Sequence, residues 1–560
     1  FVADSSLVSP QTQALSDTEQ MLLALWMRYL PIKNVDPECD FFRLGGHSLL
    51  AVTLVAEINR TFHCALTLKD IFHYSTLRAL SARIAQQSIT DAAASQDDWV
   101  IVHDPEHRHQ PFPLTDVQRA YWLGRQTGAT SIATHIYHEF DVEHFNVTRF
   151  THAVNALIAR HEMLRARVLP DGTQQILAQV PAYQLEQRDL SALSPNARND
   201  ALMAIRDRLS HHVHPADRWP LFDFSYSACT AQHGRLHFSL DLLIADALSM
   251  RTLQQELMML YREPHVSLPL LPFSFRDYVQ ALLVEQASEA YARDQAYWQR
   301  ALPQLYGPPT LPVQGDLAQL SAIRFVRRRH RLSAHNWGVL SALAQRTRIT
   351  KTALLLTVFS QVLARWSLSP TFTLNLTLFN RPQGYPNAEA VIGDFTAVSL
   401  LNVCYDSQHS YAHNAQRIQV QLWEDLEHRR FSGIRASEAL IHSGRFHAPM
   451  PVVFTSMLDI DGETTAQDPR DTTRFTLCPD ANITQTPQVW LDHQVIELAG
   501  ELHFNWDAVE QLFDTTLLDQ MFGAYCHALQ ALVAMPQSWW GVNSSLALPT
   551  VSAPDRKSVC

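Results

Sequence analysis

The sequence predicts a multidomain protein: a small all-α bundle of four helices, followed by a large α/β domain of two lobes. Three observations lead to this prediction. The chain has 560 residues, several times the roughly 100–200 residues of an ordinary domain. Residues 86–98 read QQSITDAAASQDD, a small and polar composition that is typical of a linker. Only helical patterns precede this stretch, whereas helix and strand patterns are interspersed after it.

The composition excludes several classes of protein. Hydrophobic residues make up 46% of the chain, which rules out a wholly disordered protein. The net charge is −11 and the pI is about 6.2, which argues against a nucleic-acid partner because phosphate binding needs clustered Lys and Arg. No long apolar run or signal-peptide pattern is present, so no membrane contact is expected. The seven cysteines are scattered and form no CxxC pair, which indicates a reducing cytoplasmic location and no metal site.

Four helical segments precede the linker. Ser16 and Glu19 are spaced as in a capping box, and the apolar run Met21–Leu30 follows them. Leu49–Phe62 carries apolar residues at helical spacing. Shorter helices are expected around Ile71–Phe72 and over Leu77–Ile84, which completes a minimal bundle.

More than 430 residues after the linker mix the two periodicities. Apolar faces with a period of 3.6 residues predict helices over Thr148–Arg160 and Lys351–Trp366. Alternation and β-branched content predict strands over Arg235–Leu243, Thr371–Leu378 and Gln488–Leu498. The order of these segments is that of a large α/β domain.

The segment Asp40–Leu50, DFFRLGGHSLL, is the first with chemical interest. Gly45 and Gly46 allow a tight turn, and Ser48 follows at a predicted helix start. Free N–H groups at a helix start favour an attached phosphate. Serine is equally common there as a plain helix cap, so spacing alone leaves both interpretations open.

A second segment, Phe238–Met250, places Asp241, Asp246 and Ser249 in an apolar stretch. Buried carboxylates are costly unless they are paired or hydrogen-bonded. A structural role, with the aspartates bonded to Arg or backbone groups, is favoured by spacing alone; a polar site inside a tunnel is the functional alternative. The nearby histidines in His211–Asp217, HHVHPAD, lack partners at metal-ligand spacing and are expected to be exposed or locally bonded.

A third segment pair contains Thr455, in PVVFTSM, and Asp492, in TQTPQVWLDHQ. Thr455 ends a β-branched strand, and Asp492 alternates with apolar residues, so it can face a cavity. Taken alone, these patterns favour a plain strand threonine and a surface carboxylate over a functional pair.

Residues 15–85 resemble a peptidyl carrier domain of a nonribosomal peptide synthetase. The stretch around Ser48 matches the attachment motif of that family without departure, at Asp40, Phe41, Phe42, Leu44, Gly45, Gly46, His47, Leu49 and Leu50. The resemblance implies that Ser48 receives 4′-phosphopantetheine, whose thiol carries acyl groups, from a phosphopantetheinyl transferase.

Residues 111–545 resemble a heterocyclization domain, a relative of the condensation domains of these synthetases. The resemblance rests on the segments FPLTDVQRAYWLGR, RHEMLRA, DxxxxDxxS, GDFTAVSLL, PVVFTSM and TQTPQVWLD, in that order. It implies two chloramphenicol-acetyltransferase-like lobes with a tunnel between them, and a centre where Asp241, Asp246 and Ser249 meet Thr455 and Asp492.

The resemblance also assigns roles to single residues. Thr455 and Asp492 take the places implicated in cyclodehydration. Leu242 stands where condensation domains have a histidine that is often viewed as catalytic, and leucine cannot accept a proton. We also expect Gln485 to orient the reacting carbonyl.

The expected organisation is a carrier at 1–88, a linker at 89–110, a heterocyclization domain at 111–545 and a second linker at 546–560. The expected function is amide formation between a carrier-bound acyl group and a Cys, Ser or Thr on a downstream carrier, then cyclodehydration to a thiazoline or oxazoline. Upstream synthetase domains are expected partners, and a siderophore pathway of the yersiniabactin type is the expected home. The alternatives are condensation without cyclisation and a non-catalytic scaffold that docks carriers.

Overall fold

The computed structural model describes residues 15–30, 32, 35–42, 44, 48–86, 100–126, 134–315, 320, 323–382, 385–446, 450–458, 473–478 and 481–541. The residues Gly45, Gly46 and His47 of the expected attachment motif, and the side chain of Ser48, lie outside this description. The expected C-terminal linker at 546–560 also lies outside it.

The N-terminal unit is a bundle of four helices, as expected. They are α1 (Asp17–Tyr29), α2 (Ser48–Phe62), α3 (Leu68–His73) and α4 (Leu77–Gln86). The predicted capping box is present at the start of α1, where Glu19 N–H donates to Ser16 Oγ over 3.2 Å and Ser16 N–H donates to Glu19 Oε2 over 2.8 Å. Leu22, Trp26, Phe41, Leu54 and Ile71 form its fully buried core.

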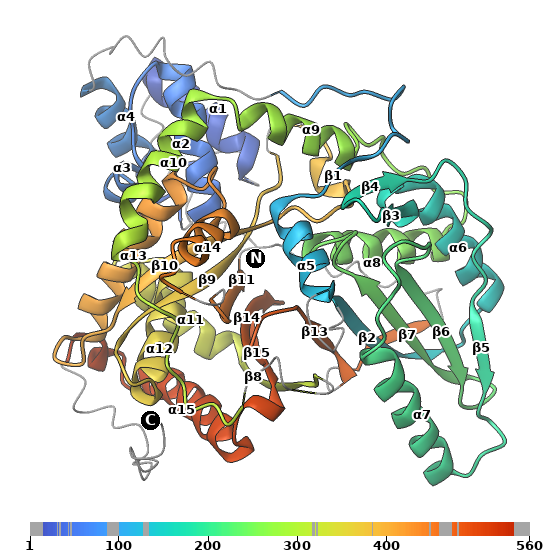
Figure 1. Cartoon of the computed structure of the whole chain (residues 1–560). Coiled ribbons are helices and arrows are strands. Elements are labelled where there is room, and N and C mark those ends of the chain that lie inside the picture. Colours follow the sequence, from blue (N-terminus) through green and yellow to red (C-terminus); the bar gives the residue numbers. More distant parts are fainter. Residues whose placement is uncertain are drawn as a thin grey trace.

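The first lobe of the large domain is built on a sheet with the strand order β12-β2-β7-β6-β5, and β13 pairs with β2 beside this path. Helices α6 and α8 bury their apolar sides on one face of the sheet, and α7 contacts β2 and β7. The bounds are β2 (His135–Glu143), β5 (Glu186–Asp189), β6 (Phe222–Ala228), β7 (His233–Asp241), α6 (Val147–Arg160), α7 (Pro195–Ser210) and α8 (Ala247–Arg262). A three-stranded sheet of β1 (Phe112–Pro113), β4 (Thr173–Ile176) and β3 (Ala166–Val168) lies beside it (Figure 1).

The second lobe carries a sheet with the order β10-β9-β11-β14-β15-β8. Helices α11, α12, α13 and α15 bury much of their surface in one core with this sheet. The strands are β8 (Phe325–Leu332), β9 (Thr371–Phe379), β10 (Thr396–Cys404), β11 (Val452–Met457), β14 (Leu491–Leu498) and β15 (Glu501–Val509). Its helices are α10 (Glu289–Ala301), α11 (Ala334–Arg346), α12 (Lys351–Trp366), α13 (Tyr411–Glu427), α14 (Gly433–His442) and α15 (Thr515–Ala534), whereas α9 (Phe275–Glu285) buries its apolar residues in the core of the first lobe. Short 3₁₀ turns are η2 (Glu162–Arg165), η3 (Leu302–Gln304), η5 (Ala388–Ala390), η7 (Glu510–Leu512) and η8 (Pro536–Trp540).

Most predicted elements are confirmed, and two strand boundaries differ. The strand expected over Gln488–Leu498 begins at Leu491, because Gln488 has a left-handed φ of 65° in a turn after Pro487. The strand expected over Arg235–Leu243 ends at Asp241, where the chain turns toward α8. Both differences arise at turns that apolar alternation does not detect.

The two lobes exchange elements. Strands β12 (Arg474–Leu477) and β13 (Ile483–Gln485) follow β11 in the chain but pair with β2 of the first lobe. Helix α5 (Asp116–Gln126) lies between the lobes (Figure 1) and is paired with α14 of the second lobe. Arg119 lies 3.0 Å from Glu438, and Arg435 lies 2.8 Å from Asp116. The junction between the lobes is therefore tied by several segments distant in sequence.

The bundle rests on the second lobe through α3 and α13 (Figure 1). The rings of Phe72 and Trp423 lie 4.1 Å apart, and Phe42 stacks on the other side of Phe72 at 4.1 Å. Lys69 Nζ lies 2.9 Å from Glu424, and Leu68 N–H donates to Glu427 over 2.9 Å. The Phe42 ring, from the attachment motif, thus connects to the large domain through one aromatic stack.

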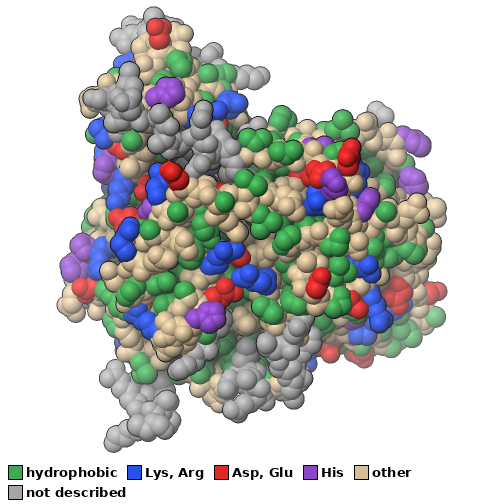
Figure 2. Space-filling model, turned by 45° about the horizontal axis from the view of Figure 1, so that its top comes forward, with side chains coloured by type: hydrophobic (Ala, Val, Ile, Leu, Met, Phe, Trp, Pro, Cys, Tyr) green, Lys and Arg blue, Asp and Glu red, His purple; other side chains and the backbone are tan. Residues whose placement is uncertain are grey.

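The face shown in Figure 2 has acidic and basic side chains interspersed with hydrophobic ones, and neither sign gathers into one large patch. Among the described residues, no helix is long and apolar enough to cross a membrane, and no cluster of three or more His, Cys, Asp or Glu could hold a metal ion. The described cysteines 64, 229, 404, 478 and 526 are free thiols.

Candidate active site

The chain from β7 into α8 holds Asp241 in a buried ion pair. Asp241 is the last residue of β7 and is 1% exposed. Its Oδ1 accepts from the guanidinium of Arg125, at the end of α5, and from Leu243 N–H at 2.9 Å. Burial raises the pKa of Asp241 even though Arg125 acts to lower it. The structural role anticipated for this aspartate, bonding to Arg and to the backbone, is therefore present.

Asp246 and Ser249 form the start of α8. Asp246 caps the helix by accepting Ser249 N–H at 2.7 Å, and the same oxygen accepts from Arg381 at 2.8 Å. Ser249 Oγ donates to Gly393 O at 2.9 Å and accepts from Gly393 N–H at 3.2 Å. These bonds fasten the segment before β10 onto the start of α8, directly beside both site residues.

Gly393 is required by this close approach. A Cβ at this position would lie 2.0 Å from the Phe275 ring, far inside van der Waals contact. Only glycine fits there without moving the ring or the backbone. The GDFT motif thus contains a steric requirement of the site.

Thr455 and Asp492 meet on neighbouring parallel strands, β11 and β14. Thr455 Oγ lies 3.2 Å from Asp492 Oδ1 and 2.9 Å from Thr377 Oγ on β9. Gln494 Nε2 donates to Asp492 Oδ2 at 2.6 Å, and Asn505 Nδ2 donates to Gln494 Oε1 at 3.2 Å. A hydroxyl and a carboxyl are thus held together by side chains from four strands of one sheet.

The pKa of the Asp492 carboxyl is shifted toward neutral pH. Asp492 is 7% exposed, and burial, with a smaller contribution from the Asp507 charge, raises its pKa to about 7. Asp507 faces it directly on β15 and forms an ion pair with Arg327 at 2.5 Å. A carboxyl with a pKa near neutrality can both give and accept a proton under mild conditions.

Tyr121, on α5, connects the two parts of the site electrostatically. Desolvation raises its pKa well above the ordinary value, and the charges of Asp394, Asp492 and Asp246 raise it further. Asp246 from the first lobe and Asp492 from the second therefore both act on one phenol at the junction. Sequence reasoning missed Tyr121, together with Arg125, Arg381 and Asp394. The signal for Tyr121, Arg125 and Asp394 was membership of the QRAYWLGR and GDFT motifs, and Arg381 lies in neither motif.

Gln485 and the histidine cluster lie elsewhere around β2. Gln485 Nε2 donates to Ser210 O at 2.8 Å, so its amide is directed to the end of α7. The expectation that the histidines are exposed or locally bonded is wrong for His214. This side chain is buried and lies 3.2 Å from Ser239 on β7, because its loop folds over the sheet. Leu242 is buried.

Ser48 is the first residue of α2, as the phosphate-binding interpretation requires. Asp40, earlier in the same motif, accepts Phe42 N–H at 2.9 Å and also bonds Ser75. A serine hydroxyl at a helix start offers a nucleophile for attachment and free N–H groups for a phosphate. The backbone at Ser48 therefore fits a phosphopantetheine group.

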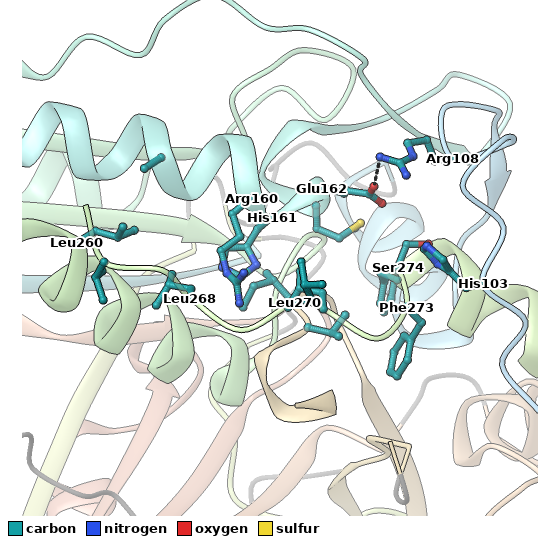
Figure 3. Close-up of a pocket in the computed structure, with 17 residues that line it drawn as sticks. His103, Arg108, Arg160, His161, Glu162, Leu260, Leu268, Leu270, Phe273 and Ser274 are labelled. Atoms are coloured by element: carbon teal, nitrogen blue, oxygen red, sulfur yellow. Dashed lines mark ion pairs between the residues drawn. The ribbon is translucent and has the colours of Figure 1, made fainter. Parts of the chain in front are cut away.

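A separate pocket of about 490 Å³ borders the Gly393 segment through Val391, Ile392 and Phe275 (Figure 3). Its charged side chains are paired: Arg108 lies 3.6 Å from Glu162, and Glu256 lies 2.9 Å from Arg160 and 2.7 Å from His161. None of the site residues predicted from the sequence lines this pocket.

Comparison with known families decides the classification. Residues 108–542 match the condensation domain family, and residues 20–84 match the phosphopantetheine attachment site family. The chain belongs to the condensation domain family. The condensation domain here follows a carrier domain that holds 4′-phosphopantetheine on a serine, as expected from the sequence.

Individual relatives confirm the nonribosomal peptide synthetase family. Pyochelin synthetase PchF of Pseudomonas aeruginosa is 36% identical over 78% of this chain, and phenyloxazoline synthase MbtB of Mycolicibacterium paratuberculosis is 33% identical over 94%. The chain spans only 24% of the first and 44% of the second. The EpoB cyclization-docking bidomain of Sorangium cellulosum superposes with a TM-score of 0.71 at 35% identity, covering 82% of this chain and 93% of that one. The two-lobed fold expected from the resemblance is thus confirmed.

Proposed function

We propose that the condensation domain joins a carrier-bound acyl group to a cysteine and then closes and dehydrates a thiazoline ring. The observation that carries this proposal is the buried contact of 3.2 Å between Thr455 and Asp492, whose pKa is about 7. The names of two relatives, a phenyloxazoline synthase and a cyclization bidomain, support ring formation as the reaction class.

The first step is amide formation. When bound, phosphopantetheine supplies a thiol that holds the acyl group as a reactive thioester. We assign its attachment to Ser48. The acceptor amine attacks the acyl carbonyl carbon, the C–S bond breaks, and the amine proton ends on the released thiol. Leu242 cannot accept that proton, so we assign most of the rate of this step to proximity of the two tethered reactants.

In the second step the ring is closed and dehydrated by Asp492, which Thr455 holds by a hydrogen bond. The cysteine thiol adds to the amide carbonyl and gives a cyclic adduct with one hydroxyl. Protonated Asp492 donates its proton to that hydroxyl, the C–O bond breaks, and water leaves. The Asp492 carboxylate then takes the proton from the ring nitrogen as the C=N bond forms. One water is lost in total, and Asp492 regains its proton.

The remaining groups position the substrates. Asp241 binds Arg125 and fixes the end of β7. Asp246 binds Arg381 and fixes the start of α8. Ser249 fastens the Gly393 segment. The bond from Gln485 to Ser210 supports a role in fixing β13 rather than in orienting the carbonyl.

Several finer assignments rest on the sequence and the family alone. They are a downstream carrier loaded with cysteine, upstream synthetase domains, a phosphopantetheinyl transferase as the modifying partner, a siderophore product and a cytoplasmic location. A test of attachment is direct: Ser48→Ala should abolish the mass gain that a phosphopantetheinyl transferase produces. A mass gain that persists in this variant would move the attachment site to another serine.

The test of the proposed function is the mass of the product. An acyl group is loaded on the carrier, a separate cysteinyl carrier is supplied, and the product is weighed. A product one water lighter than the linear amide supports ring formation. A linear amide alone supports condensation without cyclisation, and no transfer supports a docking scaffold.

A further inference from the structure

Two carboxylate oxygens beside the site are buried without a hydrogen-bond donor among the described residues. They are Asp246 Oδ2 and Asp394 Oδ2, and each residue is 1% exposed. The other oxygen of each is satisfied, since Asp394 Oδ1 accepts Thr396 N–H at 3.1 Å and Asp246 Oδ1 accepts from Ser249 and Arg381. A buried ionised oxygen with no donor is costly, and two such oxygens in neighbouring segments require an explanation.

The fold holds the backbone of Asp246 against the segment that carries Asp394. Asp246 N–H donates to Gly393 O at 3.1 Å, and Gly393 directly precedes Asp394. Ser249 adds two further bonds to Gly393. Gly393 packs so closely on the Phe275 ring that there is no room even for a Cβ, so the segment cannot move toward Phe275. One guanidinium, that of Arg381, serves the pair, so two ionised carboxylates would leave an uncompensated negative charge.

We propose that Asp394 carries a proton at neutral pH and donates it to Asp246 Oδ2, so that the two carboxyls share one proton. A single proton gives both unpartnered oxygens a partner, and the cluster with Arg381 becomes neutral. Asp394 is then a positioning residue that acts through Asp246. It holds the segment before β10 against the start of α8. This inference deepens the proposed function, on which its effect on turnover rests.

The groups that surround Asp394 indicate that one group of this cluster changes charge near neutral pH. The titratable and charged groups that face Asp394 are Asp246 on α8, Arg381 after β9, Tyr121 on α5 and Tyr278 on α9. Burial, with a smaller contribution from the Asp246 charge, raises the pKa of Asp394 to about 8. Burial and the nearby carboxylates raise the pKa of both tyrosines, so they stay neutral in that range. Asp394 is therefore the group in this cluster that changes charge in mildly alkaline solution.

The sign of the effect follows from this shift. A folded-state pKa above the ordinary value means that the protonated carboxyl stabilises the folded protein at low pH, and that this contribution is lost as pH rises through about 8. Above that pH, two carboxylates face one guanidinium, and repulsion acts to separate the Gly393 segment from α8.

Two substitutions of Asp394 distinguish a shared proton from simple packing. Asp394→Asn has the same shape and an N–H donor for Asp246, but it does not titrate. Asp394→Ala leaves Asp246 Oδ2 without a donor. In the product assay at neutral pH, we expect Asp394→Ala to lower the rate about tenfold and Asp394→Asn to retain most of it. The Asn variant should also keep its rate to higher pH than the unmodified chain.

Two measurements without substrate separate this inference from the proposed function. The infrared band of a protonated carboxyl should be present near neutral pH, shrink as pH rises through about 8, and lose that component in Asp394→Asn. The thermal unfolding temperature of the unmodified chain should fall over the same range, and that of Asp394→Asn should fall less. Asp425→Asn, at another buried carboxyl with a pKa of about 7, is the matched control and should leave the Asp394 component in place.

Two results would overturn the shared proton, and a third would overturn the proposed function alone. An Asp394→Asn spectrum identical to that of the unmodified chain at neutral pH would overturn the shared proton, as would an Asn variant as impaired as the Ala variant. If the infrared component is present but no ring forms in the product assay, the proton pair stands and the proposed function fails.

Discussion

Thr455 and Asp492 are in hydrogen-bond contact at 3.2 Å, although they lie on separate strands and 37 residues apart. The contact is possible because β11 and β14 run parallel and in register, with Val453 opposite Asp492. Gln494 and Thr377 hold the two groups from either side. This relationship places a hydroxyl beside a carboxyl whose pKa is about 7.

Removal of the Thr455 hydroxyl should slow ring formation without blocking amide formation. Thr455→Val keeps the shape of the side chain but takes away the hydrogen bond to Asp492, and we expect the dehydration rate to fall about tenfold or more. Thr455→Ser keeps the hydroxyl and should retain most of the activity. Separate quantification of linear amide and ring checks this, and equal losses in the Val and Ser variants would contradict it.

The ratio of ring to linear amide should depend on pH. The dehydrating form of Asp492 is protonated, and its pKa is about 7. As pH rises above that value the protonated fraction falls, so dehydration should slow by about tenfold for each further pH unit. The ratio of products isolates this step from any effect on amide formation. A ratio that rises or stays flat between neutral and alkaline pH would be incompatible with Asp492 as the acid.

The ring contact between Phe72 and Trp423 should carry most of the contact between carrier and condensation domain. Lys69 and Glu424 are 43% and 41% exposed, and ion pairs of this kind contribute at most about 1 kcal/mol. A buried aromatic contact contributes more. We expect Trp423→Ala to slow single-turnover transfer from the carrier by about five- to tenfold and Glu424→Gln to have a smaller effect.

A matched control for this contact is Trp540→Ala, which removes a half-exposed tryptophan elsewhere on the second lobe. This variant should transfer at the normal rate. If Trp423→Ala transfers as fast as the control, the contact between α3 and α13 is not used in the reaction.

Gly393→Ala should destabilise the protein. The added Cβ meets the Phe275 ring at 2.0 Å, and overpacking of this kind costs about 1–3 kcal/mol. Gly338→Ala, in the exposed part of α11 with open space around it, should be neutral or stabilising by up to about 1 kcal/mol. Thermal unfolding of the two variants provides the comparison, and equal melting temperatures would refute the steric requirement.

The fold was predictable from the sequence where periodicity is strong, as in α12, which spans Lys351–Trp366 as expected. The chemistry was predictable where a motif gathers it, as for Thr455 and Asp492. The sequence did not predict that β12 and β13 cross to the first lobe, because short strands carry little periodic signal and their pairing is non-local. It also did not predict the roles of Tyr121 and Asp394. A single titratable residue in an apolar motif resembles core packing until the fold brings other charges to it.

The most direct test of the account compares Asp492→Asn with the unmodified chain in a single-turnover reaction with a cysteinyl carrier. Asp200→Asn, at an exposed position on α7, is the control. If Asp492 is the dehydrating acid, the unmodified chain and the control should release a product one water lighter than the linear amide. Asp492→Asn should accumulate the linear amide, with dehydration at least about a hundredfold slower. An undiminished yield of the dehydrated ring from Asp492→Asn would contradict the central claim.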